Sequence, residues 1–353
     1  MLRIITTEMN QMYMRVCATI AAVMLTCACA AQTLGGTSVY NFLRLPATPV
    51  LTAAGGVNTS FKAHEVGLTA NNPSLLDENV SRQLNASFNT FPGGVHTYSL
   101  TGATQVPKQG AVAAGHIYFL DYGAIPQTDA AGNTSGTFRP VDFVVQLSAA
   151  KKYLQKWHYG ASLKFIHSSY QQYRSSGLAV DAGLLYTDTA NDLTASVLAR
   201  NMGVQLSSYA GERDDLPFDL QVGITKRLAK SPFGFSFTAH HLHQFDILYH
   251  DTTFNVTNNF TTGTGFFNKL LNHFVFATHI YLGNHLEGTI GYNHLRRSEL
   301  NIGSAANGLT GFSTGLRLKL KKFQVLYAHT NYQRNISWNH FGVTMHMDRL
   351  FGL

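Results

Sequence analysis

The chain has 353 residues, of which 13% are charged and 12% aromatic, with 31 glycines and a net charge of +7. This charged fraction is low for a soluble protein of this size. The lysines and arginines are scattered, whereas a nucleic-acid-binding protein would gather them on one face, so the composition disfavours that class.

The N-terminus has the pattern of a secretory signal peptide. Arginines at positions 3 and 15 precede an apolar run from Val16 to Leu25, and small residues follow. We predict a signal peptide at residues 1–31, cleaved within Ala30 to Gln32. All three cysteines, at positions 17, 27 and 29, fall inside it. The remaining chain is therefore expected to have no disulfide and no cysteine-based metal site.

A lipoprotein signal is the alternative, because Cys27 and Cys29 lie near the end of the apolar run. Such a signal normally has leucine three residues before its cysteine. Here those positions hold Met24 and Thr26, so we favour the ordinary secretory signal.

Residues 32–82 lack the alternating pattern of β-strands. They mix small residues, prolines and a few large apolar side chains, which predicts a plug-like segment of short turns or helices packed in or under the rest of the fold. After the signal no run approaches the roughly 18 to 20 apolar residues of a spanning helix. If the mature chain lies in a membrane, it must therefore be a closed β-barrel.

The clearest strand pattern runs from Phe218 to Thr225, where apolar residues alternate with polar ones. Successive side chains of a strand point to opposite faces. We expect the apolar face to meet lipid and Asp219 and Gln221 to face the lumen.

About fourteen similar runs occupy residues 83–353, each long enough to cross a bilayer as a tilted strand. We predict an all-β fold, a transmembrane antiparallel β-barrel of about fourteen strands. The runs begin near Leu84, Gly94, Ala111, Phe138, Trp157, Gly177, Leu193, Phe218, Phe233, His273, His285, Leu309, Phe323 and Ile336.

The connections between these runs alternate between long and short. The long ones, at 122–137, 207–217, 250–272 and 297–308, all fall at the same end of the predicted strands. Outer-membrane barrels have short periplasmic turns, long outside loops and periplasmic termini. A secreted β-sandwich is the alternative, but it has no reason to segregate loop length by end and would carry more surface charge.

Charged residues of both signs lie on the polar face of the predicted strands. We expect them to pair with one another in a filled interior, because an unpaired buried charge is costly. A selective channel is the alternative. The residues concerned are Asp142, Lys164, Asp181, Arg200, Asp219, Glu287 and Arg317.

The sequence gives only weak indications of a metal-binding or catalytic site. His241 and His243 would share a face of a strand next to His240, but no carboxylate or cysteine cluster completes a metal site, so none is predicted. Hydrolase and phosphate-binding motifs are missing from the sequence, and a pair such as Ser337 and His340 arises by chance in a serine-rich barrel. We predict no catalytic residues, no cofactor and no enzyme activity.

Two outer loops are the candidate partner-binding surfaces. Aromatic residues in a polar loop can anchor a protein, although they can equally pack on neighbouring loops or enter the membrane interface. The candidate residues are Tyr209, Glu212 and Arg213 in one loop, and Phe254, Phe260, Phe266 and Phe267 in the other.

The N-terminal segment resembles that of the outer-membrane long-chain fatty-acid transporter superfamily. The matching residues are Asn41-Phe-Leu-Arg-Leu-Pro46, Gly55-Gly56, Asn72-Pro73 and Leu75-Leu76. Two departures concern details of the plug. Ser74 stands where the family usually has alanine, and Thr48-Pro-Val-Leu-Thr52 replaces its usual small residues before the glycine pair.

Within this superfamily the chain is similar to the PorQ family of the type IX secretion system of Bacteroidetes. The resemblance rests on Ser176-Gly-Leu-Ala-Val-Asp-Ala-Gly183 and on Tyr209-Ala-Gly-Glu-Arg213 leading into Leu216-Pro-Phe218, with support from Phe233 to Asp246 and Gly311-Phe-Ser313.

The resemblance implies an outer-membrane barrel of a Gram-negative bacterium. It would bind PorZ directly, in the attachment complex with PorU and PorV, so that the PorU sortase joins cargo to anionic lipopolysaccharide. The alternative implied by the superfamily is a channel for long-chain fatty acids or other hydrophobic solutes.

Overall fold

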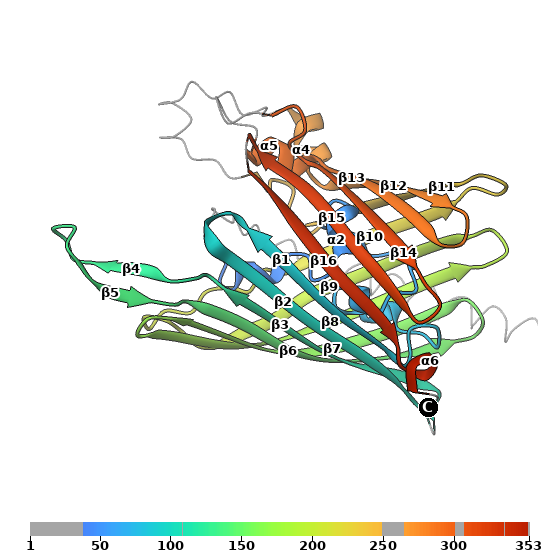
Figure 1. Cartoon of the computed structure of the whole chain (residues 1–353), viewed down its shortest axis with the longest axis horizontal. Coiled ribbons are helices and arrows are strands. Elements are labelled where there is room, and N and C mark those ends of the chain that lie inside the picture. Colours follow the sequence, from blue (N-terminus) through green and yellow to red (C-terminus); the bar gives the residue numbers. More distant parts are fainter. Residues whose placement is uncertain (1–37, 108, 249–264, 301–306, 335, 352–353) are drawn as a thin grey trace, which may run out of the picture. The chain divides into compact units, whose positions relative to one another are not determined.

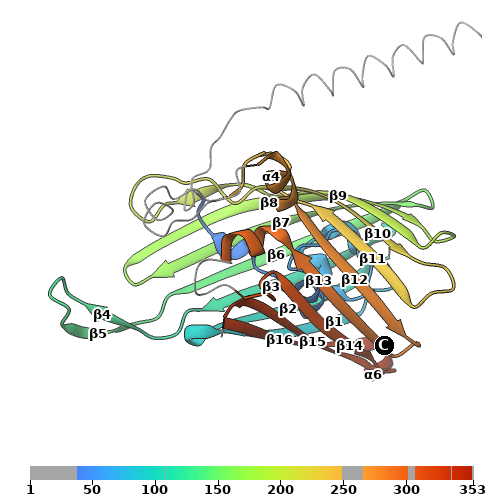
Figure 2. The same cartoon turned by 90° about the horizontal axis from the view of Figure 1, so that it is seen from above.

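The computed structural model describes residues 38–107, 109–248, 265–300, 307–334 and 336–351. The predicted signal peptide, Phe254 and Phe260 lie outside these ranges. In the described part of the chain, fourteen strands form one closed antiparallel barrel, in which β1 pairs with β16 to close the ring. Figures 1 and 2 show the tilted strands around the lumen.

The barrel strands follow the chain in order. They are β1 (Gln83–Phe91), β2 (Val95–Val106), β3 (Ala111–Asp121), β6 (Val141–Tyr153), β7 (Trp157–Tyr170), β8 (Tyr173–Asp188), β9 (Leu193–Ser207), β10 (Asp219–Arg227), β11 (Phe233–Ala239), β12 (Phe274–Leu282), β13 (Leu286–Asn293), β14 (Phe312–Lys319), β15 (Phe323–Gln333) and β16 (Ile336–His346). The prediction of a transmembrane β-barrel fold is confirmed, and the largest errors in strand starts are at β6, β8 and β14.

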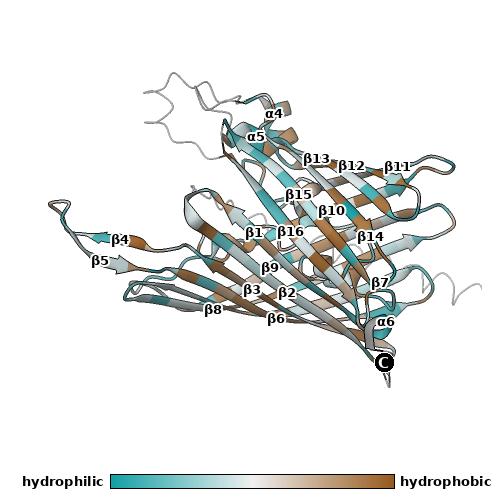
Figure 3. Cartoon of the chain, viewed as in Figure 1, coloured by the Kyte–Doolittle hydropathy of each residue, from teal (hydrophilic) through white to brown (hydrophobic). Residues whose placement is uncertain are grey.

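Side chains alternate between the lumen and the outer surface, as the sequence predicts. In β10, Asp219 and Gln221 are buried while Val222 and Ile224 are 42% and 44% exposed. The exposed apolar residues of the wall form a belt, with aromatic residues such as Tyr98 and Tyr159 among them. Figure 3 shows the alternating colours along the strands. This pattern suits a wall that faces hydrocarbon outside and polar groups inside.

Short helices complete the described chain. They are η1 (Asn41–Arg44), α2 (Pro49–Ala53), η2 (Val66–Ala70), η3 (Pro73–Leu75), η4 (Pro92–Gly94), α4 (Phe266–Asn272), α5 (His294–Leu300) and α6 (Met347–Phe351). Among the described helices, none is both long enough and apolar enough to cross a membrane.

The long connections all lie at one end of the barrel, as predicted from their lengths. They join β3 to β6, β9 to β10, β11 to β12 and β13 to β14, whereas the opposite end has only short turns. We call these the loop end and the turn end. The first long connection also contains a hairpin that the sequence analysis missed, β4 (Ile125–Thr128) paired with β5 (Thr134–Phe138), which projects from the loop end in Figure 1.

Residues 38–82, which we call the plug, lie inside the ring. At the loop end Ser38 bridges to Asp215, and the Val39 N–H donates to the Asp215 carbonyl at 2.9 Å. Farther along, α2 packs on β13 to β16, while η3 packs on β6 to β8 across the lumen. The plug ends at Arg82, where β1 begins at the turn end. It therefore runs the length of the barrel.

Candidate functional site

Glycines in the barrel wall let the plug lie directly against the strands. These wall glycines are Gly160, Gly183, Gly223, Gly291 and Gly315. A Cβ atom at Gly291 would lie 2.3 Å from the Gly55 nitrogen, and one at Gly160 would lie 2.5 Å from the Pro73 carbonyl carbon. Real Cβ atoms do not approach backbone so closely, because non-bonded atoms repel one another well before that distance. The wall and the plug are therefore complementary in shape on several sides.

Hydrogen bonds join the plug to strands around the ring. Thr52 Oγ1 pairs with His340 Nδ1 at 2.8 Å on β16, and Ser60 Oγ pairs with Thr225 Oγ1 at 2.8 Å on β10. On β9, Ser196 Oγ accepts a bond of 2.9 Å from Asn72 Nδ2. Since β16 lies across the ring from the neighbouring strands β9 and β10, these bonds fix the plug on two opposite sides.

Four of the seven charged residues that were predicted to pair with one another do so in the lumen, and Arg200 instead donates to the plug carbonyl of Leu43 at 2.9 Å. Lys164 and Asp181 form an ion pair of 2.7 Å, with exposures of 2% and 0%. Arg317 donates to Glu287 and also to the plug carbonyl of Ala63. Asp142 instead accepts bonds from the hydroxyls of two tyrosines, Tyr122 and Tyr170, at 2.7 and 2.9 Å. The interior is thus a filled polar core, in which each of these charges has a stated partner.

The glycine pair of the plug is required by its backbone. Gly55 and Gly56 have φ of +93° and +89°, a region that residues with a Cβ rarely adopt. Their sharp turn presents the Gly55 carbonyl to the wall, where Asn293 Nδ2 and Arg296 Nη2 donate to it at 3.0 and 2.9 Å. The motif therefore shapes the plug and its attachment.

The serine that replaces the usual alanine of the superfamily is accommodated within the plug. Ser74 is fully buried, and its hydroxyl donates to Asn72 Oδ1 at 2.7 Å. The same oxygen accepts the Ser74 N–H at 3.0 Å and so caps η3. This departure leaves the local turn intact.

Residues 176–183, the stretch on which the closer resemblance rests, turn their inner face toward the plug. A Cβ at Gly177 would lie 2.8 Å from the ring of Tyr40, and one at Gly183 would lie 2.3 Å from Asn72 Oδ1. Between them, Asp181 pairs with Lys164. The small residues of this stretch thus serve plug packing.

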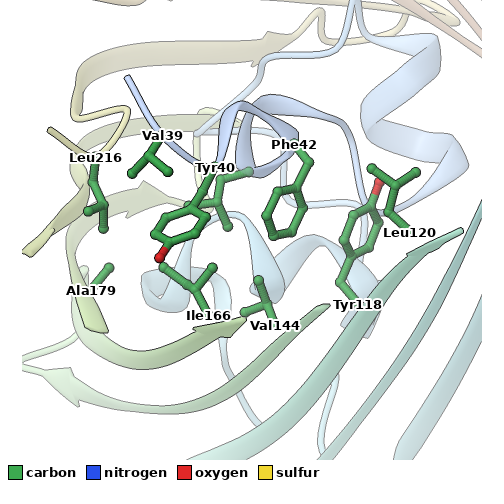
Figure 4. Packing of buried hydrophobic residues seen from close by; sticks show 10 residues of the cluster. Val39, Tyr40, Phe42, Tyr118, Leu120, Val144, Ile166, Ala179 and Leu216 are labelled. Carbon is green, nitrogen blue, oxygen red and sulfur yellow. The ribbon is translucent and has the colours of Figure 1, made fainter. Parts of the chain in front are cut away.

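The start of the plug is covered by the loop between β9 and β10. Leu216 of this loop packs with Val39, Tyr40 and Phe42 of the plug, and the Phe42 ring stacks on that of Tyr118 at 6.4 Å. Figure 4 shows these side chains gathered between plug and wall. The loop therefore holds the plug at the loop end.

The predicted partner-binding residues of this loop differ in accessibility. Tyr209 is half-buried against the plug cluster, with its ring 5.6 Å from that of Tyr170. Glu212 and Arg213 are exposed, and Arg213 Nη2 donates to the Leu206 carbonyl at 3.3 Å. Only the latter two are free to meet a partner over much of their surface.

The other predicted surface contains an exposed aromatic patch, formed by Phe245, Phe266 and Phe267. The latter two, on α4, are 61% and 76% exposed, and the Phe245 ring lies 5.6 Å from that of Phe266. Lys269 and Asp246 form an ion pair of 2.5 Å that ties α4 to the turn after β11. Phe245 and the helix were missed by the sequence analysis, which placed a loop at residues 250–272.

The three histidines after β11 are arranged differently from the prediction. Since β11 ends at Ala239, they lie in a turn, and His240 and His241 both meet the Asp219 carboxylate. The expectation that no carboxylate accompanies them is therefore wrong. Burial lowers the pKa of His240 to about 3 and that of His241 to about 4, so both imidazoles are neutral at pH 7.

The serine–histidine pair considered in the sequence is not brought together. His340 is buried and bonded to Thr52 of the plug, whereas Ser337 is exposed on the opposite face of β16. These two residues cannot act as nucleophile and base on one substrate.

A cavity of about 400 Å³ opens at the turn end, between the plug and the wall. Its lining carries charges of both signs and includes the plug residues Phe61 to His64. The charged lining residues are Lys62, Asp188, Asp192, Arg227, Glu287, Arg317 and Lys319.

Comparisons with known proteins show the fold alone. No family model and no curated protein matches the sequence. Among solved structures, the CymD monoaromatic hydrocarbon channel is similar at a TM-score of 0.50 and 12% identity, covering 87% of this chain and 97% of that one. A deltaS2 mutant of the TodX monoaromatic hydrocarbon channel has a TM-score of 0.50 and 11% identity, covering 85% and 97%. The chain has the fold of an outer-membrane β-barrel.

Proposed function

We propose that this chain is an outer-membrane barrel that anchors a surface partner in an attachment complex of the type IX secretion system. The observation that carries the proposal is the plug, which fills the lumen and is fixed to the wall by close packing and hydrogen bonds. A barrel filled in this way is suited to act as a scaffold. The assignment to this secretion system rests on the resemblance of residues 176–183 and 209–218 to PorQ-like barrels.

The partner surface in this proposal is the aromatic patch together with the exposed charged tip at Glu212 and Arg213. Exposed aromatic side chains anchor protein interfaces well, because they bury a large area at low cost in side-chain entropy. The direct partner would be PorZ. PorU, as the sortase, would perform the transfer of cargo to anionic lipopolysaccharide, with PorV in the same complex, and the barrel itself would perform no chemistry.

The test is partner retention on intact cells. Replacing Phe266 and Phe267 together by serine should release most PorZ from the cell surface, while the barrel still shows the gel-mobility shift of a folded barrel on heating. Tyr153, which is 61% exposed at the turn end, provides the matched control. Its serine variant should retain PorZ. Wild-type levels of surface PorZ after deletion of the whole barrel would refute the anchor role.

A hydrophobic-solute channel is the second candidate, and one observation favours it. The pairing of β8 with β9 loses register between Ser176 and Gly177 and again between Val180 and Ala182. A bulge of this kind leaves a residue without a ladder partner and locally disrupts the pairing of the wall. In the present structure Asp181 Oδ1 accepts the Asn201 N–H at 2.8 Å and so bridges the break.

Uptake by proteoliposomes separates the two functions. A channel should carry a long-chain fatty acid or a monoaromatic hydrocarbon faster than liposomes that hold an unrelated sealed barrel. Equal rates would exclude the channel and leave the anchor proposal standing.

A further inference from the structure

Three side chains with metal-binding atoms meet at the loop end of the lumen. Asp219 is the first residue of β10, and His240 and His241 follow the last residue of β11. One ligand atom from each lies within 4.8 Å of the other two. The β10–β11 pairing brings these positions together, although they are about twenty residues apart in the sequence.

The two histidine side chains are hydrogen-bonded to one another, and one nitrogen of the pair is left without a partner. His240 Nδ1 and His241 Nδ1 approach to 2.6 Å, and His241 Nδ1 lies 3.8 Å from Asp219 Oδ2. The other nitrogen of His240, Nε2, is buried and makes no hydrogen bond within the described residues. The side chain of His240 is only 1% exposed. A buried imidazole with an unpaired nitrogen calls for a partner, because burial without one is unfavourable.

Surrounding contacts hold the three groups in place. The His241 N–H donates to Asp219 Oδ1 at 2.6 Å, and Gln221 Nε2 donates to Asp219 Oδ2 at 2.6 Å. The carbonyl of His240 accepts a bond of 2.8 Å from His273 Nδ1. His241 has φ of +54°, a conformation that is uncommon outside glycine and tends to occur at functional sites. Outer contacts of this kind orient the ligands of metal sites.

We propose that Asp219, His240 and His241 bind a divalent metal ion such as Zn²⁺. Two imidazoles and one carboxylate suit Zn²⁺, Ni²⁺ or Cu²⁺ and do not suit Ca²⁺ or Mg²⁺, which prefer oxygen ligands. The His241 side chain is 12% exposed, so water can complete the coordination. Arg44 of the plug interacts electrostatically with all three groups and opposes a cation. The binding free energy from the three ligands must therefore exceed the repulsion between Arg44 and the ion.

The bound ion would fasten the turn after β11 to the start of β10. This turn continues into Phe245 and the ion pair with α4, so the ion would also stiffen the aromatic patch. The site stands apart from the partner proposal, because it is defined by its own ligands and is tested by metal binding alone.

The test uses the full-length, tag-free barrel in detergent, stripped with a chelator. Titration with Zn²⁺ in a calorimeter should give one ion per chain, and Co²⁺ should give visible absorption bands of nitrogen and oxygen ligands. His241→Asn and Asp219→Asn should each weaken binding by about tenfold or more. His285→Asn, which changes an exposed histidine in a turn-end connection, should bind as the wild type does.

The heat-dependent gel shift checks the folding of every variant. If Asp219→Asn does not fold, the result for His241→Asn decides the question. The proposal is overturned if the stripped wild type takes up no Zn²⁺. It is also overturned if folded His241→Asn protein binds Zn²⁺ with wild-type affinity.

Discussion

At the scale of single residues, the wall glycines decide whether the plug fits. Gly291 is the most confined, because its neighbours at 2.3 to 2.5 Å are backbone atoms of the plug. Gly115, by contrast, lies on an exposed position of β3 and has no atom within 4 Å of an added Cβ. The two positions form a matched pair that separates plug packing from general effects of replacing glycine.

We expect Gly291→Val to destabilise the protein by about 1–3 kcal/mol, because overpacking forces the plug or the strand to move. The midpoint of thermal unfolding in detergent should fall, and ion conductance in a planar bilayer should rise. Gly115→Val should change neither quantity. Unchanged stability in Gly291→Val would show that the plug can retreat from the wall without cost.

The buried pair of Lys164 and Asp181 provides a second prediction at this scale. Lys164→Met leaves the Asp181 carboxylate buried without its cation, so a loss of about 3–5 kcal/mol in unfolding free energy is expected. Adding Asp181→Asn should restore much of the loss, since the amide oxygen can still accept the Asn201 N–H. Unfolding by denaturant in detergent measures both variants. A double variant no more stable than the single one would argue against charge burial as the cause.

At the scale of elements, the question is whether the plug stays fixed. The Ser60 and Thr225 oxygens lie 2.8 Å apart across the plug and β10. Cysteines at both positions should form a disulfide that locks the plug to the wall. Because the plug already fits the wall closely, oxidised and reduced protein should have the same bilayer conductance. The Ser60→Cys single variant controls for the substitution, and a conductance that rises on reduction would identify the plug as a moving hatch.

The sequence predicts the strands well, because a wall between lipid and a polar lumen imposes the same period of two on every strand. Phe218 to Thr225 is the clearest case. The β4–β5 hairpin was missed because it lies outside this wall, where neither face is buried and the pattern fades. His240 shows the same limit, since it lies beside Asp219 of another strand, and pairing between strands is not visible in a local pattern.

Little of the candidate site was predicted from the sequence. Gly55 and Gly56 were noted only through the superfamily resemblance, and their positive φ values give the physical reason for glycine at both positions. Phe245 could not be assigned, because its neighbour Phe266 is more than twenty residues away and the contact between their rings depends on the turn after β11. Long-range contacts of this kind carry most of the site.

At the scale of the whole molecule, we expect the plug to determine whether the barrel is permeable. Replacing residues 41–76 by a short glycine–serine linker should leave the strands paired but remove the polar groups that satisfy the lumen. The barrel should then conduct ions and small sugars, and its thermal stability should fall. Swelling of proteoliposomes in sugar solutions measures the opening. A deletion variant that stays sealed would mean that the barrel collapses without the plug or that the outer loops close it.

The contact between the first and last strands also has a consequence for biogenesis. The plug precedes β1 in the chain, bonds to strands on several sides and reaches from one mouth to the other, while the seam between β1 and β16 closes the ring. A finished ring would oblige this segment to thread lengthwise through a lumen that it fills. We therefore expect the plug to lie against the open sheet before β1 and β16 pair, so that closure of this seam comes late in folding.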